Sequence, residues 1–531
     1  MSDLKFTRRA AIGGAAAGAA AAAVPAAAAT KSKTKPTRYV DVVVVGAGLA
    51  GLMAARRLTH AHKSVVVLEA DNRVGGRVLN LDIGGGKITE GGAEFIGETQ
   101  NHIASLAKTL GLKTFKTYNE GNNLYYRNGI ALPYQSTGPL GPVPPDPTGG
   151  ADAEQAIVKL DQMASQVNLE KPWESPNAAA WDSQTFETWK QDNVKTPNGQ
   201  FLLDVACTSV FSCEPRDVSL LFVLFYIAAA GDESHPGTLE RLVTTAPGAQ
   251  SDRIVGGTQL IPIRMAQHLG KKVVLSSPVR KITQQKDRVI VDSDKLTAVG
   301  QRVIVAIPPP LAGRLQYSPA LPALRDQLTQ RMPMGSVMKV IAIYDKPFWR
   351  DGGWTGQVVS DKGPAQVTFD STPPEGTPGA LMAFIEASTS RQLNAVSKDA
   401  LKAKVLDNFA TYYGDKARHP IAFYEKRWDN DIWHRGCPVC YTPPGVLLDY
   451  GTAIRQPIGR IHWAGTETST FWNGYMDGAV RSGERAAEEV RTLLKTTPKP
   501  PKSPTGGSGN SGSGSSGGQG SDRGDPRILG R

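Results

Sequence analysis

The sequence has few cysteines and no long apolar run beyond its N-terminal region. Four cysteines in 531 residues do not provide the disulfide framework of a cysteine-rich secreted scaffold. No later segment has the roughly 20 apolar residues that a membrane-spanning helix requires. The formal net charge is +11, but no basic stripe with interleaved aromatic residues appears. We therefore expect neither a stable membrane span nor nucleic-acid binding, and we assign no metal site.

Both ends of the chain differ in composition from the rest. Basic residues that include Arg8 and Arg9 precede an alanine- and glycine-rich run, which is typical of an export signal over residues 1–29. The paired arginines favour the twin-arginine route, and an ordinary secretory signal is the alternative. Residues 496–531 are rich in glycine and serine and are predicted to be disordered. We expect a periplasmic or extracellular mature protein, and its oligomeric state, a homodimer included, stays open.

A dinucleotide-binding pattern begins at four consecutive valines, residues 42–45, which predict a buried strand. The strand is followed by Gly46, Gly48 and Gly51, with spacing that allows a tight turn, a close approach of a pyrophosphate and close packing of the next helix. A second apolar strand ends at Glu69, which is placed to accept hydrogen bonds from ribose hydroxyls. The pattern predicts a Rossmann-like fold that binds a dinucleotide.

A second signature follows at Arg73-Val74-Gly75-Gly76-Arg77. This segment resembles the motif that follows the acidic residue in flavoproteins with two dinucleotide-binding domains. The resemblance favours FAD over NAD as the cofactor and implies that Arg73, Gly76 and Arg77 help to bind it.

Further blocks make the resemblance specific. The chain looks like the monoamine oxidase branch of the flavin amine oxidases over about residues 40–490. The blocks that carry the resemblance are Gly91-Gly92-Ala93, Gly256-Gly257, residues 333–339, residues 464–468 and residues 474–480. The family implies an α/β flavoprotein with an FAD domain and an interleaved α+β substrate domain. The expected FAD domain is discontinuous and consists of residues 38–127, 251–312 and 451–495. The expected substrate domain consists of the intervening residues 128–250 and 313–450.

The resemblance also implies several contacts with FAD. Glu467 would face the ribityl chain, and the backbone of Val279 would receive the adenine. Gly92 and Gly465 belong to matching blocks and are assigned to the cofactor site. Cys437 matches the cysteine that some members bond to the flavin 8α carbon, and this predicts a covalent FAD.

Two departures surround Cys437. Pro438 stands where the covalent enzymes have the second of two tyrosines that flank the incoming amine. Cys440 creates a Cys-x-x-Cys pattern, so that a Cys437–Cys440 disulfide is an alternative to the covalent flavin.

Four residues are candidates for the catalytic site. Lys339 lies in an otherwise apolar run, where an unpartnered lysine would be costly to bury. The resemblance gives it the role of holding a water at flavin N5; a lysine that points outward from an edge strand is the alternative. Tyr475 matches the retained tyrosine of the pair, and Trp428 matches a tryptophan near the flavin. Gln250 matches a glutamine that lines the substrate site, although an exposed loop position is also consistent with the sequence.

Glu94 is the fifth candidate, at a position where the family often has an aromatic residue. A carboxylate beside an apolar pocket could bind a second cationic group on the substrate. It could equally hydrogen-bond internal groups of the protein. A diamine therefore stays open beside an arylalkyl monoamine.

The residues together predict an FAD-dependent amine oxidase. A hydride would pass from a primary or secondary amine to the flavin, and O2 would then reoxidise the flavin. An L-amino-acid oxidase would need an arginine to bind the substrate carboxylate. A flavin-bound protein without turnover, acting as a binding module, is the third reading.

Overall fold

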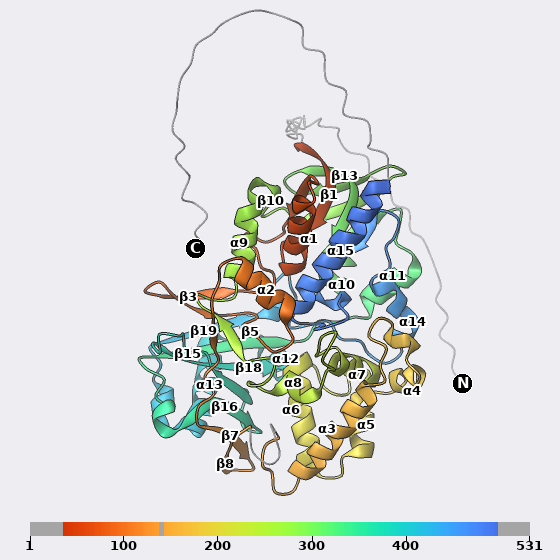
Figure 1. Cartoon of the computed structure of the whole chain (residues 1–531). Helices are drawn as coiled ribbons and strands as arrows, with labels where there is room; N and C mark the ends of the chain where they lie inside the picture. Colours follow the sequence, from red (N-terminus) through yellow and green to blue (C-terminus); the bar gives the residue numbers. More distant parts are fainter. Residues whose placement is uncertain (1–34, 137–142, 497–531) are drawn as a thin grey trace, which may run out of the picture.

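The four valines lie in a central strand of the first large sheet of the computed structural model, which describes residues 35–136 and 143–496 (Figure 1). The β-branched run favours a strand buried on both faces, and residues 42–45 are almost completely buried. In their order across the sheet, the strands are β10 (Val273–Val274), β2 (Val65–Leu68), β1 (Thr37–Val45), β13 (Thr297–Val305), β12 (Val289–Ser293), β11 (Val279–Gln284) and β14 (Gln316–Ser318), with β20 (Ile461–Trp463) also paired to β13. The parallel pairing of β1 with β2 and β13 confirms the predicted dinucleotide-binding core.

Helices from both ends of the chain pack together on this sheet. Figure 1 shows the C-terminal helix α15 (Met476–Thr496, blue) beside the first helix α1 (Leu49–His60, red). Gly483 permits the contact, because a Cβ there would lie 2.3 Å from the carbonyl oxygen of Ala50. The helices α2 (Asn101–Thr109) and α9 (Leu260–Leu269) share the same buried cluster.

The second large sheet carries the wall of the site. Its strands are, in order, β19 (Ala422–Arg427), β15 (Val337–Tyr344), β18 (Gly379–Glu386), β17 (Val367–Asp370), β16 (Trp354–Ser360), β7 (Asn122–Arg127) and β8 (Ile130–Tyr134). β15 is entirely buried between β19 and β18. Two smaller sheets pair β3 (Asn80–Gly84) with β4 (Lys87–Glu90), and β5 (Phe95–Ile96) and β6 (Thr114–Lys116) with β9 (Asp252–Ile254).

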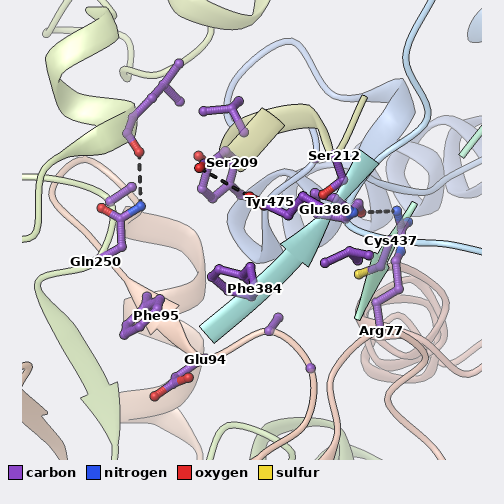
Figure 2. Close-up of a pocket in the computed structure, with 18 of the residues that line it drawn as sticks. Arg77, Glu94, Phe95, Ser209, Ser212, Gln250, Phe384, Glu386, Cys437 and Tyr475 are labelled. Atoms are coloured by element: carbon purple, nitrogen blue, oxygen red, sulfur yellow. Dashed lines mark hydrogen bonds between the residues drawn. The ribbon is translucent and has the colours of Figure 1, made fainter. Parts of the chain in front are cut away.

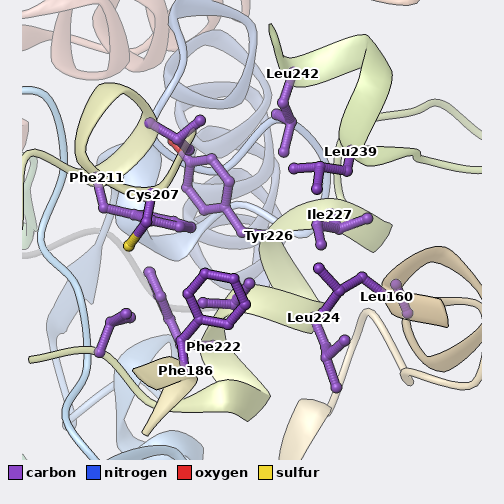
Figure 3. Packing of buried hydrophobic residues seen from close by; sticks show 14 of the residues in the cluster. Leu160, Phe186, Cys207, Phe211, Phe222, Leu224, Tyr226, Ile227, Leu239 and Leu242 are labelled. Atoms are coloured by element: carbon purple, nitrogen blue, oxygen red, sulfur yellow. The ribbon is translucent and has the colours of Figure 1, made fainter. Parts of the chain in front are cut away.

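A helical layer completes the substrate side. The apolar segment that begins at Leu220 forms the buried helix α7, and Figure 3 shows the cluster of aliphatic and aromatic side chains around it. The helices of this layer are α3 (Gly150–Ala164), α4 (Ala178–Asp182), α5 (Phe186–Asn193), α6 (Pro197–Phe211), α7 (Leu220–Ala228) and α8 (Leu239–Val243). The remaining helices are α10 (Pro309–Ala312), α11 (Ala323–Gln330), α12 (Ala387–Leu393), α13 (Lys398–Tyr413) and α14 (Val446–Tyr450).

The strand pairing differs from the predicted domain boundaries at two places. β7 falls inside the segment 38–127 assigned to the FAD domain, but it hydrogen-bonds to β16 of the second sheet. β14 falls inside the segment 313–450 assigned to the substrate domain, but it pairs with β11 of the first sheet. The chain therefore enters the second sheet before residue 127, at β7. After its return to the first sheet it stays there beyond residue 312, through β14.

Two predicted segments lie outside the described residues: the export signal at 1–29 and, from residue 497, the tail. Within residues 35–136 and 143–496, no helix is both long and apolar enough to cross a membrane.

The close packing at Gly51 leads to a test of the first helix. A Cβ at Gly51 would lie 2.0 Å from the carbonyl oxygen of Gly46, so Gly51→Ala forces β1 and α1 apart. We expect a loss of about 1–3 kcal/mol in the free energy of unfolding, the usual cost of overpacking. The measurement is urea unfolding of the cofactor-free protein. Gly48→Ala is the matched control, because a Cβ there meets nothing within 4 Å; an equal loss in both variants would contradict the argument.

Candidate active site

The turn between β1 and α1 opens onto a cavity of about 410 Å³. Gly46 has φ +99°, a conformation that favours glycine, and Gly48 lines the cavity with open space in front of it. No side chain caps the N-terminus of α1. The turn and the free N–H groups thus form a cradle that suits a pyrophosphate.

Glu69 follows β2 and also lines this cavity. Its Oε2 accepts a hydrogen bond from the backbone N–H of Ala47 at 2.5 Å, and its Oε1 accepts one from Asp71 N–H at 2.8 Å. Burial raises the pKa of Glu69 more than these hydrogen bonds lower it. The carboxylate lies beside the cradle, as a ribose-binding group should.

Val279 begins β11 and is not among the residues that line the cavity. The segment that leads to it lies next to the acidic residue, since the N–H of Ser277 donates to the carbonyl of Glu69 at 2.7 Å. The structure therefore places Val279 near the ribose end of the cradle, without opening it to the cavity.

The second signature contributes one structural arginine and one cavity arginine. Arg73 donates to the carbonyl oxygens of Val78 and Gly76 at 3.1 and 2.9 Å, so it holds the loop in shape. Arg77 lines the cavity beside Gly76 and makes a two-pronged ion pair with Glu467, at 2.6 and 3.2 Å. Burial opposes the charge on Arg77, but the carboxylate of Glu467 outweighs it and raises the pKa of Arg77.

Glu467 and Gly465 come from the C-terminal block. Gly465 has φ +121° and lines the cavity, and Glu467 is 2% exposed. The ion pair with Arg77 therefore joins motifs 390 residues apart in the sequence at one wall of the cavity.

Lys339 is buried and lies on an interior strand, not on an edge. Its Nζ contacts Glu94 Oε2 at 2.6 Å and donates to the carbonyl oxygen of Gly92 at 3.1 Å. A side chain at Gly92 would collide with the carbonyl oxygen of Arg77, at 2.3 Å from the added Cβ. The outward-pointing alternative for Lys339 is thus excluded by its position.

Glu94 belongs to a buried network of charges. Besides Lys339, it pairs with Arg253, whose Nε lies 2.8 Å from Glu94 Oε1, and it accepts a short hydrogen bond from Ser371. Arg253 in turn binds Glu90 at 2.8 Å. Burial opposes the charged form, but the cations of Lys339 and Arg253 outweigh it and lower the pKa of Glu94. Of the two roles considered for Glu94, these contacts support the one inside the protein.

The aromatic candidates surround the cavity. The ring of Tyr475 lies 4.8 Å from that of Trp472 and 6.0 Å from that of Tyr226, measured between centroids. Burial raises the pKa of Tyr475, so its phenol stays protonated at neutral pH. Trp428 is 1% exposed, lines the cavity and donates from Nε1 to the carbonyl oxygen of Gly91 at 3.1 Å. Pro438 lines the cavity where the sequence lacks the second tyrosine.

The two neighbouring cysteines face different surroundings. Cys437 lines the cavity, whereas Cys440 is fully buried in a separate apolar cluster, with its sulfur 3.0 Å from that of Met334. Both are free thiols, and so are Cys207 and Cys213. Burial raises the pKa of Cys437 to about 12, although Arg77 acts in the opposite direction.

Figure 2 shows three further polar residues of the cavity, Gln250, Ser209 and Glu386. Gln250 donates from Nε2 to the carbonyl of Leu242 at 3.0 Å, and its Oε1 is buried without a hydrogen-bond partner. Three residues near the site, Arg253, Ser209 and Glu386, belong to none of the motifs recognised in the sequence. Glu386 accepts a hydrogen bond from Ser209 at 3.3 Å and also lines the cavity. Because side chains alternate along a strand, the acidic Glu386 shares a face of β18 with Phe384, and this pattern could have marked it in the sequence.

The chemistry of these residues suits FAD. The glycine cradle at Gly48, the carboxylate of Glu69 and the wall at Gly465 all border one continuous cavity. No group of three or more histidine, cysteine or acidic residues suited to a metal ion occurs within the described part of the chain.

The fold and the cavity define a flavoprotein of the two-dinucleotide-binding-domain class, with an α/β FAD domain and an interleaved substrate domain. The sequence matches the family described as flavin containing amine oxidoreductase over residues 49–491. The chain belongs to this family. It is an FAD-dependent amine oxidase, an oxidoreductase that acts on amines.

Named relatives agree with this assignment. The flavin-containing amine oxidase of Oncorhynchus mykiss is 38% identical over 456 residues, which cover 85% of each chain. Among solved structures, wild-type putrescine oxidase bound to putrescine has a TM-score of 0.81 at 32% identity, covering 86% of this chain and all of that one. Cyclohexylamine oxidase from Brevibacterium oxydans IH-35A has a TM-score of 0.80 at 33% identity, covering 86% and 99%.

The ion pair of Glu94 predicts a pH-dependent loss of stability. Glu94→Gln leaves Lys339 and Arg253 with less negative charge, and we expect it to lower the free energy of unfolding by about 3–5 kcal/mol at neutral pH. Because the pKa of Glu94 is lower in the folded state, its contribution is present above the unfolded value of about 4.3 and is lost as pH falls through the folded pKa. Urea unfolding of both proteins between pH 7 and acid pH measures this.

The control is Glu375→Gln, which changes an exposed carboxylate and should cost at most about 0.5 kcal/mol. A difference between wild type and Glu94→Gln that does not shrink toward acid pH would contradict the assigned ion pair.

Proposed function

We propose that this protein oxidises a primary or secondary amine, an arylalkyl monoamine or a diamine, with O2 as the electron acceptor. Amine, O2 and water would give an aldehyde or ketone, ammonia or a smaller amine, and hydrogen peroxide. The observation that carries the proposal is the single cavity that runs from the dinucleotide cradle at Gly48 to Tyr475 and Lys339.

FAD, when bound, supplies the acceptor for a hydride from the carbon next to nitrogen. The protein groups orient the amine and exclude water. The neutral phenol of Tyr475 offers its ring face to an unprotonated amine. The mostly apolar walls keep bulk water away from the reacting carbon. Lys339 has a fixed Nζ, and we assign to it the placement of the water that assists reoxidation by O2.

An amino-acid substrate is less well supported. It would require an arginine for the substrate carboxylate. Among the described residues that line the cavity, Arg77 is the one arginine, and its guanidinium is bound to Glu467 and to the carbonyl oxygen of Pro438. The structure therefore supports an L-amino-acid oxidase less well than an amine oxidase. No observation favours a non-catalytic role.

We propose that the protein is exported after cleavage of a signal within residues 1–29. The support is the composition of that segment, with Arg8 and Arg9 before an alanine-rich run. The twin-arginine route exports folded proteins, which suits an enzyme that binds its cofactor in the cytoplasm.

We also propose that Cys437, whose thiol is free and borders the cavity, bonds to the flavin 8α carbon. The new C–S bond would replace the S–H bond of Cys437 and one C–H bond of the 8α methyl group, and the two electrons released would pass to the flavin and then to O2. Acid-precipitated wild-type protein should retain its flavin, and Cys437→Ser should release all of it into the supernatant. The control Cys440→Ser alters a thiol in the separate apolar cluster and should retain the flavin. Since the thiol has a raised pKa, attachment should become faster with increasing pH. A wild type that releases all its flavin would end this proposal.

The test of the function itself is anaerobic bleaching of the flavin absorbance band. Purified holoenzyme is mixed without oxygen with monoamines, diamines, N-methylated amines and L-amino acids. We expect bleaching by at least one class of amine and none by the amino acids. A holoenzyme that stays oxidised with every amine would contradict the proposal, and bleaching by amino acids alone would favour the oxidase of amino acids.

A further inference from the structure

Glu386 is a carboxylate on the cavity face of the second sheet. It is the last residue of β18 and lies opposite Val337 of β15, two positions along from the pair of Phe384 with Lys339. Side chains alternate between the faces of a strand, so Glu386 and Phe384 share a face, and all four of these residues line the cavity. The carboxylate is therefore in the same wall as Lys339, about 7 Å further along the strand.

The Glu386 side chain neither caps a helix nor forms an ion pair within the described residues. Glu386 occupies the position before the first residue of α12, but its side chain makes no capping hydrogen bond there. Within the described part of the chain no cation pairs with it, and its one hydrogen bond comes from Ser209 Oγ, at 3.3 Å (Figure 2). The side chain is half-buried, so it has lost part of its hydration with one hydrogen bond in return, which is costly for a carboxylate.

The contrast with Glu94 is sharp. Glu94 has two cationic partners and a hydroxyl donor, and its pKa is lowered. Burial instead raises the pKa of Glu386 well above the usual value, and the Ser209 hydrogen bond opposes this only in part. A group of this kind gains its charge and its second partner when a cation enters the cavity.

The rest of the neighbouring wall suits an aliphatic chain. Phe384, Val367 and Val337 line the same side of the cavity, and Val210 lines it from α6, one residue after Ser209. A cavity with apolar walls and one uncompensated acid matches an amine whose carbon chain bears a second basic nitrogen.

We propose that Glu386, with Ser209, binds the second ammonium group of a diamine substrate while its first amine is oxidised beside Tyr475. The proposal rests on the amine oxidase function proposed above, and it names the substrate class. The contact is a charge-assisted hydrogen bond from the ammonium to the Glu386 carboxylate, and no covalent step is involved.

The test compares matched pairs of probes in wild type and Glu386→Gln. The pairs are butylamine with 1,4-diaminobutane and hexylamine with 1,6-diaminohexane, and the readout is kcat/KM for anaerobic flavin reduction. We expect the preference for the diamine over its monoamine to fall by about tenfold or more in Glu386→Gln, because a charged hydrogen bond is lost. The monoamine value should change by no more than about threefold, since glutamine keeps the shape of the side chain and can still bond to Ser209.

Two further variants separate charge from structure. Glu386→Leu should abolish the diamine preference and leave monoamine oxidation in place. Ser209→Ala removes the hydroxyl but keeps the carboxylate, so most of the diamine preference should remain. Equal losses for diamine and monoamine in Glu386→Gln and Glu386→Leu would overturn the proposal, and so would an unchanged preference.

A binding measurement distinguishes this proposal from the proposed function. Calorimetry on dithionite-reduced holoenzyme, which cannot oxidise the amine, should show tighter binding of the diamine than of its monoamine in wild type, and equal binding in Glu386→Gln. If no amine bleaches the oxidised enzyme, the function fails, yet this binding difference still supports the second-ammonium site. If monoamines bleach it and reduced enzyme binds both probes equally, only the site assigned to Glu386 is overturned.

Discussion

A lysine ammonium in the middle of a buried sheet is the constraint around which the site is arranged. Lys339 is 2% exposed on the wholly buried strand β15, and an unpartnered charge there would be strongly unfavourable. Glu94 supplies the balancing charge, and Arg253 binds Glu94 and Glu90 together. Because Glu94 comes from the N-terminal part of the chain and Lys339 from the second sheet, the ion pair also fixes the position of that sheet against the cofactor side.

A second ion pair between residues far apart in the sequence lies at the cofactor cradle. Arg77 follows the first dinucleotide motif, and Glu467 precedes the last helix, so neither motif is complete without the other. The packing of α1 against α15 brings the two motifs together, and the ion pair between Arg77 and Glu467 joins them directly. The interleaved order of the segments is a consequence: the chain must return to the first sheet after building the substrate side.

The local parts of this structure were predictable from the sequence, and the long-range pairs were not. The strand at 42–45, the glycine spacing that follows it, the buried helix that begins at Leu220 and the helix that begins at Met476 all have short-range signals of hydrophobic period or turn chemistry. Glu94 and Lys339 are 245 residues apart, and nothing in either neighbourhood identifies the other as its partner. Strand pairing is also a non-local property, so the sequence near β7 and β14 does not identify the strands with which these two pair.

Two of the carboxylates that line the cavity, those of Glu94 and Glu386, show why residue type alone does not assign a function. Glu94 was the acid that stood out, because it replaces an aromatic residue in a recognisable motif, but the fold surrounds it with cations of its own. Glu386 is the last residue of β18, and there the fold leaves an acid with one hydrogen-bond partner, Ser209, beside the apolar side chains of Phe384 and Val337. A buried acid whose charge the protein already balances has little left to offer a ligand, whereas one left unbalanced gains by binding a cation. Specificity for a second nitrogen therefore belongs to the carboxylate that the protein does not satisfy.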